Sequence, residues 1–125
     1  PCMDFIGMPD RDTFTDEEAY YGTLLHELTH WTGHKDRLSR KQEAHSNDRE
    51  AYAFEELIAE FGAAQLCAIT GISPSPREDH AKYLNSWIRA LSESEKVLPM
   101  AMAMASKSCT YLLGLKQEGE QQQAA

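Results

Sequence analysis

The feature that most constrains this chain is the pentapeptide HELTH at residues 26–30. An α-helix turns about 100° per residue, so His26 and His30 project one above the other from one face. Two imidazoles placed in this way can bind one metal ion. Glu27 lies about 100° further around the helix, beside such an ion, where a base can act on a metal-bound water. The pentapeptide has the form H-E-x-x-H, which is typical of zinc peptidases.

The residues around the pentapeptide favour a helix of about 17 residues. The TDEE sequence at residues 15–18 has the form of a capping box, which predicts a helix beginning at Asp16 with acidic residues in its first turn. Gly33 is the expected stop. The apolar residues between these signals bury one side of the helix and place the histidines on or beside an interior face. The alternative is an amphipathic helix with two histidines on its surface.

The rest of the chain predicts three further helices. Apolar residues at helical spacing run from Tyr52 towards Gly71, after a cap at Ser46 or Asn47. A Ser-Pro-x-Glu pattern at residues 75–78 predicts the start of a third helix. The SESE sequence at residues 92–95 precedes a fourth helix that ends at Gly114. Pro99 is tolerated only in a first turn, which favours a start a few residues after that cap.

A short apolar run closed by Pro9 predicts a strand near residues 3–7, whose partner lies in residues 35–46 or upstream. We interpret the alternating methionines at positions 100, 102 and 104 as adaptable core packing on the fourth helix. The expected fold is therefore α+β but mostly helical, with four main helices and minor N-terminal strand content. Residues 1–125 are enough for one domain. Because the sequence opens on Pro1, we expect this domain to be part of a longer protein.

Composition narrows the class of protein. Hydrophobic residues make up 42% and charged residues 26%, as in ordinary globular proteins. No apolar run approaches the roughly 18 residues of a membrane span, and no signal-like segment is present, so we expect a cytoplasmic protein without a membrane partner. The three cysteines, at positions 2, 67 and 109, are widely separated, which favours free thiols over disulfides or a thiolate zinc site.

The formal net charge of −8 argues against binding of a phosphate backbone by this segment alone. Basic residues do cluster after the first helix, at Lys35, Arg37, Arg40 and Lys41. We interpret this cluster as a solvated loop.

Two histidines do not complete a catalytic zinc site, which normally has three protein ligands and one open position. Candidates for the third ligand are Asp36 and His34 in the loop after the first helix, and Glu56 and Glu55 on the second. The two loop residues reach the ion only if the chain folds back beyond Gly33.

We favour Glu56, because a rigid helix locates a ligand more tightly than a loop does. Glu60, one turn later, is then available to hold His26 or His30 and fix its orientation. Glu55 is the main alternative to Glu56, since an error of about 100° in the inferred phase of that helix would place Glu55 at the metal in place of Glu56.

The expected cofactor is one Zn²⁺ per chain, bound through neutral imidazoles. Glu27 is the expected general base, which takes a proton from the activated water and passes it to the leaving amine. Hydrolysis of a peptide also needs a donor for the oxyanion. His80 and Tyr83, at i and i+3 on the third helix, are the candidates of choice, with Tyr52 and Tyr111 as further possibilities.

Longer segments around these residues resemble the zincin-like metallopeptidase domain of ArdC-type antirestriction proteins, and plasmid TraC-type primases are similar. The likeness lies in YYGTLLHELTHWTGH at residues 20–34, RLSR at 37–40, YAFEELIAE at 52–60 and HAKYLNSW at 80–87. It extends from about residue 4 to about residue 113. The HWTGH extension makes it far more specific than H-E-x-x-H alone.

The resemblance implies a zinc-dependent peptidase-type domain in a protein of mobile elements that protects incoming DNA from restriction. Full-length members of that family also carry an N-terminal domain that binds single-stranded DNA, so the resemblance implies that residues 1–125 are the C-terminal part of a longer protein and that any such DNA contact belongs to that other domain. The resemblance therefore implies a protein or peptide substrate for this domain. The alternative is a catalytically silent, metal-containing acidic module that acts by protein interaction or DNA mimicry. Glu27 favours the enzyme, because a purely structural metal site has no use for that carboxylate.

Overall fold

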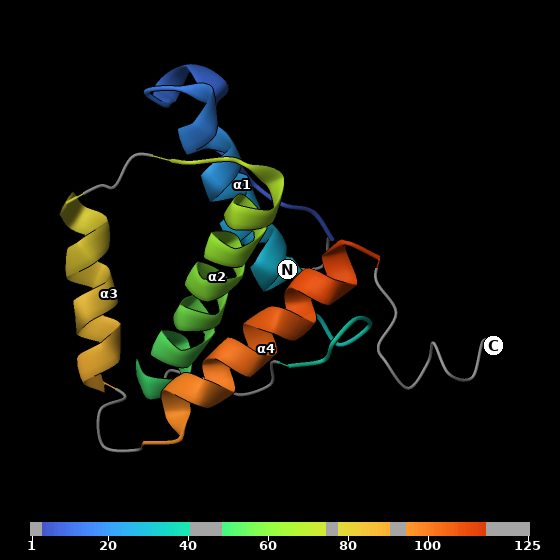
Figure 1. Ribbon diagram of the computed structural model, residues 1–125, viewed down its shortest axis with the longest axis vertical. Helices are drawn as coiled ribbons and strands as arrows, with labels where there is room; N and C mark the ends of the chain where they lie inside the picture. Colours follow the sequence, from blue (N-terminus) through green and yellow to red (C-terminus); the bar gives the residue numbers. More distant parts are fainter. Residues whose placement is uncertain (1–3, 41–48, 75–77, 91–94, 115–125) are drawn as a thin grey trace.

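The computed structural model describes residues 4–40, 49–74, 78–90 and 95–114 (Figure 1). These residues form a short 3₁₀ turn, η1 (Arg11–Thr13), and four α-helices, with no strand among them. The helices are α1 (Glu17–Trp31), α2 (Arg49–Thr70), α3 (Glu78–Ala90) and α4 (Val97–Leu112). The prediction of a mostly helical fold with four main helices is confirmed.

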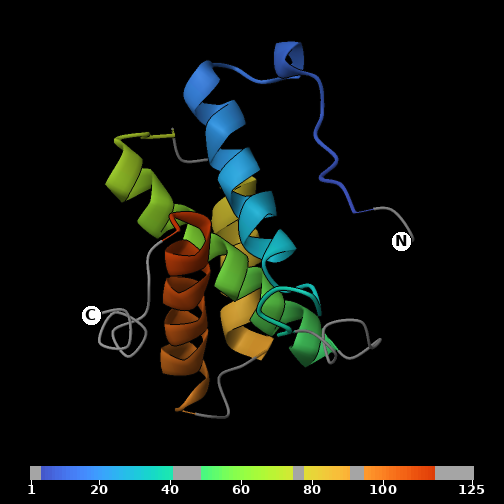
Figure 2. The same cartoon turned by 90° about the vertical axis from the view of Figure 1, so that its right-hand side faces the viewer.

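Helix α2 is the centre of the arrangement and packs against each of the other three helices. Helices α3 and α4 lie on opposite sides of α2, as the two perpendicular views show (Figures 1 and 2). Helix α1 packs along α2 and also contacts α4. The histidines of α1 are consequently brought against the carboxylates of α2.

The expected strand near residues 3–7 is wrong for the part that the structure describes, residues 4–7. This segment is irregular, and the Phe5 side chain is 64% exposed. The chain is held there by an ion pair instead of a β-ladder, because both Nη atoms of Arg37 bind the carboxylate of Asp4, at 3.1 and 3.0 Å. Residue 3 and residues 41–46 of the expected partner lie outside the described residues.

Helix α1 begins one residue later than the capping box predicts. The N-cap is Asp16, whose carboxylate accepts a hydrogen bond from the backbone N–H of Ala19 at 2.7 Å. The last helical residue is Trp31, so the helix has 15 residues and ends two residues before Gly33. The caps expected for the other helices, at residues 46–47, 75 and 92–94, lie outside the described residues.

The core lies between α2 and α4. Its buried members are Ala53, Leu57, Ile58, Ala101 and Ala105, and half-buried side chains of α2, α3 and α4 pack against them. Ala101 and Ala105 of α4 are buried against α2, and Met100 and Met102 lie on the exposed side of the helix. Met100 and Met102 are 50% and 52% exposed, so the interpretation of these two as core residues is wrong, whereas Met104 does pack on the core.

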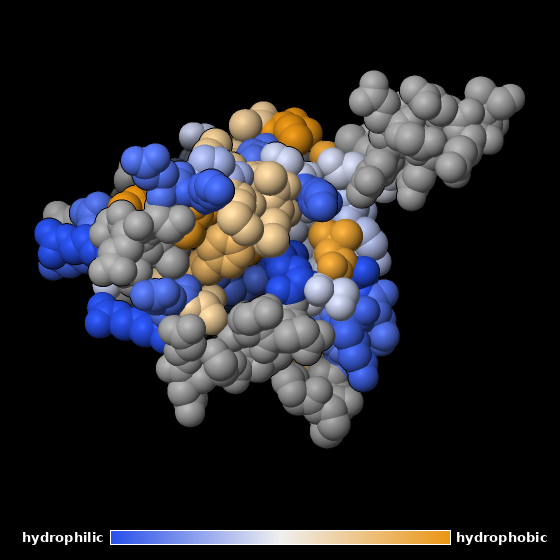
Figure 3. All heavy atoms as spheres, turned by 90° about the horizontal axis from the view of Figure 1, so that it is seen from below, coloured by the Kyte–Doolittle hydropathy of each residue, from blue (hydrophilic) through white to orange (hydrophobic). Residues whose placement is uncertain are grey.

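The end of the molecule where α2 and α4 begin carries a group of apolar atoms bordered by hydrophilic residues (Figure 3). Large apolar side chains that stay exposed on these helices include Tyr52 and Leu98. Within the described ranges, no helix combines the length and the apolar character needed to cross a membrane.

Helices α1 and α2 approach each other closely at Gly62. A Cβ atom at this position would lie 2.5 Å from Cγ2 and 2.7 Å from Oγ1 of Thr29, which is the buried residue of α1. These contacts are shorter than a Cβ atom tolerates, so a larger residue at position 62 would require the Thr29 side chain or one of the helices to shift. The close approach of the two helices lets short carboxylate side chains on α2 reach the imidazoles on α1.

Candidate metal centre

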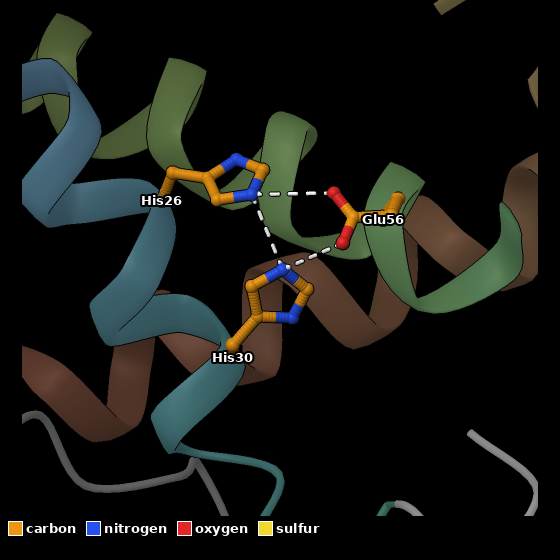
Figure 4. Close-up of side chains that lie close together, drawn as sticks. All are labelled: His26, His30 and Glu56. Carbon is orange, nitrogen blue, oxygen red and sulfur yellow. Dashed lines mark hydrogen bonds and ion pairs between the residues drawn. The ribbon is translucent and has the colours of Figure 1, made fainter. Parts of the chain in front are cut away.

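Three side chains from two helices converge at the α1–α2 interface (Figure 4). The Nε2 atoms of His26 and His30 lie 3.2 Å apart. Glu56 faces both rings, with Oε2 at 3.3 Å from Nε2 of His26 and Oε1 at 3.2 Å from Nε2 of His30. Within the described part of the chain, this is the one group of three side chains whose ligand atoms could hold a metal ion together.

The spacing of these atoms fits a small divalent cation. A tetrahedral ion with ligand bonds of about 2.0–2.1 Å separates its ligand atoms by about 3.3–3.4 Å. The distances of 3.2–3.3 Å among the two Nε2 atoms and Glu56 are close to that value. Two imidazoles and one carboxylate also form the donor set of catalytic zinc sites and of other divalent metal sites with open positions.

Carboxylates on α2 fix the outward nitrogen of each imidazole. Nδ1 of His26 donates to Oε1 of Glu60 at 2.6 Å, and Nδ1 of His30 donates to Oε2 of Glu55 at 2.8 Å. Because an ionised carboxylate only accepts hydrogen bonds, Nδ1 of each ring carries a proton whether the ring is neutral or cationic. Nε2 of each ring is then the atom that can bind a metal. Glu60 therefore holds His26, which is one of the two histidines considered for it from helical spacing.

The carboxylates also change the acidity of the histidines. Burial lowers the pKa of His26, but hydrogen bonds with Glu56 and Glu60 outweigh burial and raise it to about 10. Burial likewise opposes the hydrogen bonds of His30 with Glu55 and Glu56, which raise the pKa of His30 to about 9. Glu56 responds in the opposite sense: burial raises its pKa, but the two histidines lower it to about 2. The metal-free group therefore keeps its opposite charges at neutral pH.

The other candidates for the third ligand lie elsewhere. His34 and Asp36 are exposed in the loop after α1, where Nδ1 of His34 accepts a hydrogen bond from the backbone N–H of Asp36 at 3.1 Å. Glu55 lies at the far nitrogen of His30 and not among the three converging atoms. The helical phase inferred for α2 therefore matches the structure.

Glu27, the expected base, follows His26 on α1 and is half-buried. His80 and Tyr83 lie on α3, which packs against α2, but their side chains are outside the described part of the structure. Of the further oxyanion candidates, Tyr52 is 54% exposed and Tyr111 is 42% exposed. The ring of Tyr111 lies 6.4 Å from that of Trp31.

The interpretation of the basic cluster as a solvated loop is wrong for two of its members. Arg37 stacks on the Trp31 ring at 3.7 Å, and its side chain is 9% exposed. Arg40 is 5% exposed and binds Glu55. The sequence offers no signal for either contact, because the loop is charged and has no periodicity. Lys35 is exposed, and Lys41 lies outside the described residues.

Comparison with known proteins gives three relevant similarities. The family model MPTase-PolyVal, described as a zincin-like metallopeptidase, matches residues 1–105. A DNA primase TraC from Escherichia coli is 42% identical over 123 residues, which are 98% of this chain and 11% of the primase. The protein y4eC from Sinorhizobium fredii is 36% identical over 112 residues, which are 90% of this chain and 36% of y4eC.

Two solved structures of the antirestriction protein ArdC from plasmid R388 contain a region with the same fold. The Mn(II)-bound structure matches with a TM-score of 0.73 and 45% identity, over 86% of this chain and 39% of ArdC. The metal-free structure matches with a TM-score of 0.72 and 42% identity, over 91% of this chain and 42% of ArdC. The chain thus spans about a tenth of the TraC primase and about two fifths of ArdC. The resemblance seen in the sequence is confirmed, and the chain belongs to the zincin-like metallopeptidase family.

Proposed function

We propose that this domain contains a peptidase-type site for one divalent metal ion, with His26, His30 and Glu56 as the protein ligands. The observation that carries the proposal is the convergence of both Nε2 atoms and the Glu56 carboxylate at spacings of 3.2–3.3 Å. It is supported by the orientation of the rings, since each Nδ1 is bound to a carboxylate. Zinc, one ion per chain, is the expected cofactor.

A bound divalent ion supplies Lewis-acid activation of water and polarises a carbonyl group. Glu27 is the proposed general base, which accepts the proton of the attacking water and delivers it to the leaving nitrogen. Its place on α1 directly after His26 supports this role. His80 and Tyr83 are the proposed donors to the oxyanion. Glu55 and Glu60 hold the histidine rings still while the proton moves.

The ion itself has a second candidate. The same donor set accepts manganese, and the solved ArdC structure is described as Mn(II)-bound. Competition between Zn²⁺ and Mn²⁺ for the metal-free protein distinguishes the two. We expect zinc to bind more tightly, because affinity for nitrogen ligands rises from manganese to zinc. A preference for manganese would overturn the assignment of zinc while leaving the ligand set intact.

For the biological role, we propose that this is a cytoplasmic protein of a mobile element that protects DNA and acts on a protein or peptide substrate. The similarity to the antirestriction protein of a plasmid supports this proposal. Any contact with single-stranded DNA is assigned to a different domain, because the formal net charge of −8 disfavours a phosphate partner here.

Glu27→Gln tests the proposal, since the amide keeps the size of the side chain and removes the base. The variant should bind zinc within about threefold of the parent and lose hydrolysis of a peptide library by about 10²–10⁴-fold. His34→Gln, an exposed histidine variant from the same region, should keep full activity. Protection of unmodified DNA in restricting cells should fall with Glu27→Gln. Undiminished protection would support instead a catalytically silent acidic binding module.

A further inference from the structure

Arg40, in the loop after α1, is a buried cation next to the three converging side chains. Two of its hydrogen bonds go to Glu55, from Nε to Oε1 and from Nη2 to Oε2, each 2.9 Å long. Three more, of 2.8–3.1 Å, reach the carbonyl oxygen of Thr29 and the hydroxyls of Thr32 and Ser108. All five N–H donors of the guanidinium are therefore used. Arg40 is fixed between α1, α2 and α4.

The Glu55 carboxylate is shared between this arginine and the metal centre. Oε2 of Glu55 accepts hydrogen bonds from Nη2 of Arg40 at 2.9 Å and from Nδ1 of His30 at 2.8 Å. A two-point contact with a guanidinium fixes the plane of a carboxylate, which one contact cannot do. Movement of Glu55 would rotate the His30 ring and displace its Nε2 atom.

We propose that Arg40 is a positioning residue for the metal: through Glu55 it orients the His30 ring so that Nε2 faces His26 and Glu56. The inference rests on the proposed metal site and extends it, because the donors of Arg40 all bind groups other than the three proposed ligands. The effect is specific to His30, since His26 is held by Glu60.

Arg40→Lys separates geometry from charge. Lysine keeps the positive charge but presents a compact ammonium, which cannot form the planar two-point contact with Glu55. Arg37→Lys is the matched control from the same loop. Arg37 also forms a two-point contact, with Asp4, and donates from Nε to the carbonyl oxygen of Trp31 at 2.7 Å. Both variants lose the same kind of contact, but only Arg40 contacts the metal centre through Glu55.

The first measurement is the zinc affinity of the purified metal-free variants, by competition with a chelating dye at fixed pH. Arg40→Lys should weaken zinc binding by about 10–100-fold, as loss of a residue that supports a ligand does elsewhere. Arg37→Lys should change it by less than about threefold. In the double variant with Glu55→Gln, Arg40→Lys should weaken zinc binding little further, because both changes act through the same contact. In the double variant with Glu60→Gln, the two losses of zinc affinity should add.

The second measurement is the Nδ1 proton of His30 in metal-free protein, seen by NMR as a downfield, slowly exchanging signal. The signal should be present in the parent and in Arg37→Lys, and lost in Arg40→Lys. Retention of both the signal and the zinc affinity in Arg40→Lys would overturn the proposal, as would equal losses in Arg37→Lys. If Arg40→Lys does not fold, Glu55→Gln should show the same two losses, and parent-like behaviour of that variant would overturn it.

The two measurements keep this inference separate from the proposed function. A parent that binds neither Zn²⁺ nor Mn²⁺ refutes the metal site. The Nδ1 signal then still decides whether Arg40 orients His30, because it is recorded without metal.

Discussion

Metal binding should release two protons from this site at neutral pH. In the metal-free protein the pKa of His26 is raised to about 10 and that of His30 to about 9, so both rings are protonated at pH 7. A metal binds only the neutral imidazole and must displace these protons. The exchange is balanced electrostatically, since a divalent cation replaces two unit charges among the same carboxylates.

The magnitude follows from the number of protons. Release of two protons makes the dissociation constant fall by about 100-fold for each unit of pH, which is about 2.7 kcal/mol, as long as the pH stays well below both pKa values. Between pH 6.5 and 7.5 the zinc affinity should therefore rise by about two orders of magnitude.

Calorimetric titrations in buffers of different ionisation enthalpy count the released protons directly. His34→Gln is the control, because His34 lies in the exposed loop, and it should leave the count at about two. Fewer than one proton released at pH 7, together with a constant affinity between pH 6.5 and 7.5, would refute the reasoning. The raised pKa values would then not describe the histidines that bind the metal.

Further predictions concern stability. In metal-free protein, the raised pKa of His26 and His30 stabilises the fold fully below about pH 6.5, and this stabilisation is lost as the pH rises through 9 to 10. The lowered pKa of Glu56 stabilises the fold above about pH 4.5, and this stabilisation is lost as the pH falls towards 2. Urea unfolding without metal should therefore show a maximum between about pH 4.5 and 6.5. Gly62→Ala should lower the free energy of unfolding by about 1–3 kcal/mol, because the new Cβ meets Thr29, and Thr29→Ala in the same chain should restore part of it. An unchanged free energy of unfolding in Gly62→Ala would contradict this expectation and show that the two helices separate at little cost.

Much of the centre could be predicted from the sequence, because it depends on helical spacing. His26 and His30 share a face by their i and i+4 positions, and Glu56 with Glu60 does the same on α2. Helix existence followed from apolar periodicity in the same way. These features are local, and local geometry is what a sequence pattern specifies.

The features that could not be predicted depend on contacts between distant segments. Arg40 lies in an aperiodic loop, and only the folded chain brings it beside Glu55. From the sequence, its charge therefore predicted a solvent-exposed side chain. The apolar run around Phe5 has the composition of a strand, but in the folded chain Asp4 of this segment binds Arg37 from the loop after α1. Met100 and Met102 lie on the exposed side of α4, whereas Ala101 and Ala105 are buried against α2.

The central claim is that one divalent ion binds between α1 and α2. An anomalous difference map from a crystal of the zinc-loaded protein tests this most directly. We predict a single strong peak per chain, at about 2.0–2.2 Å from Nε2 of His26, Nε2 of His30 and an oxygen of Glu56. A peak beside His34 and Asp36, or no peak at these three side chains in zinc-saturated crystals, would contradict the account.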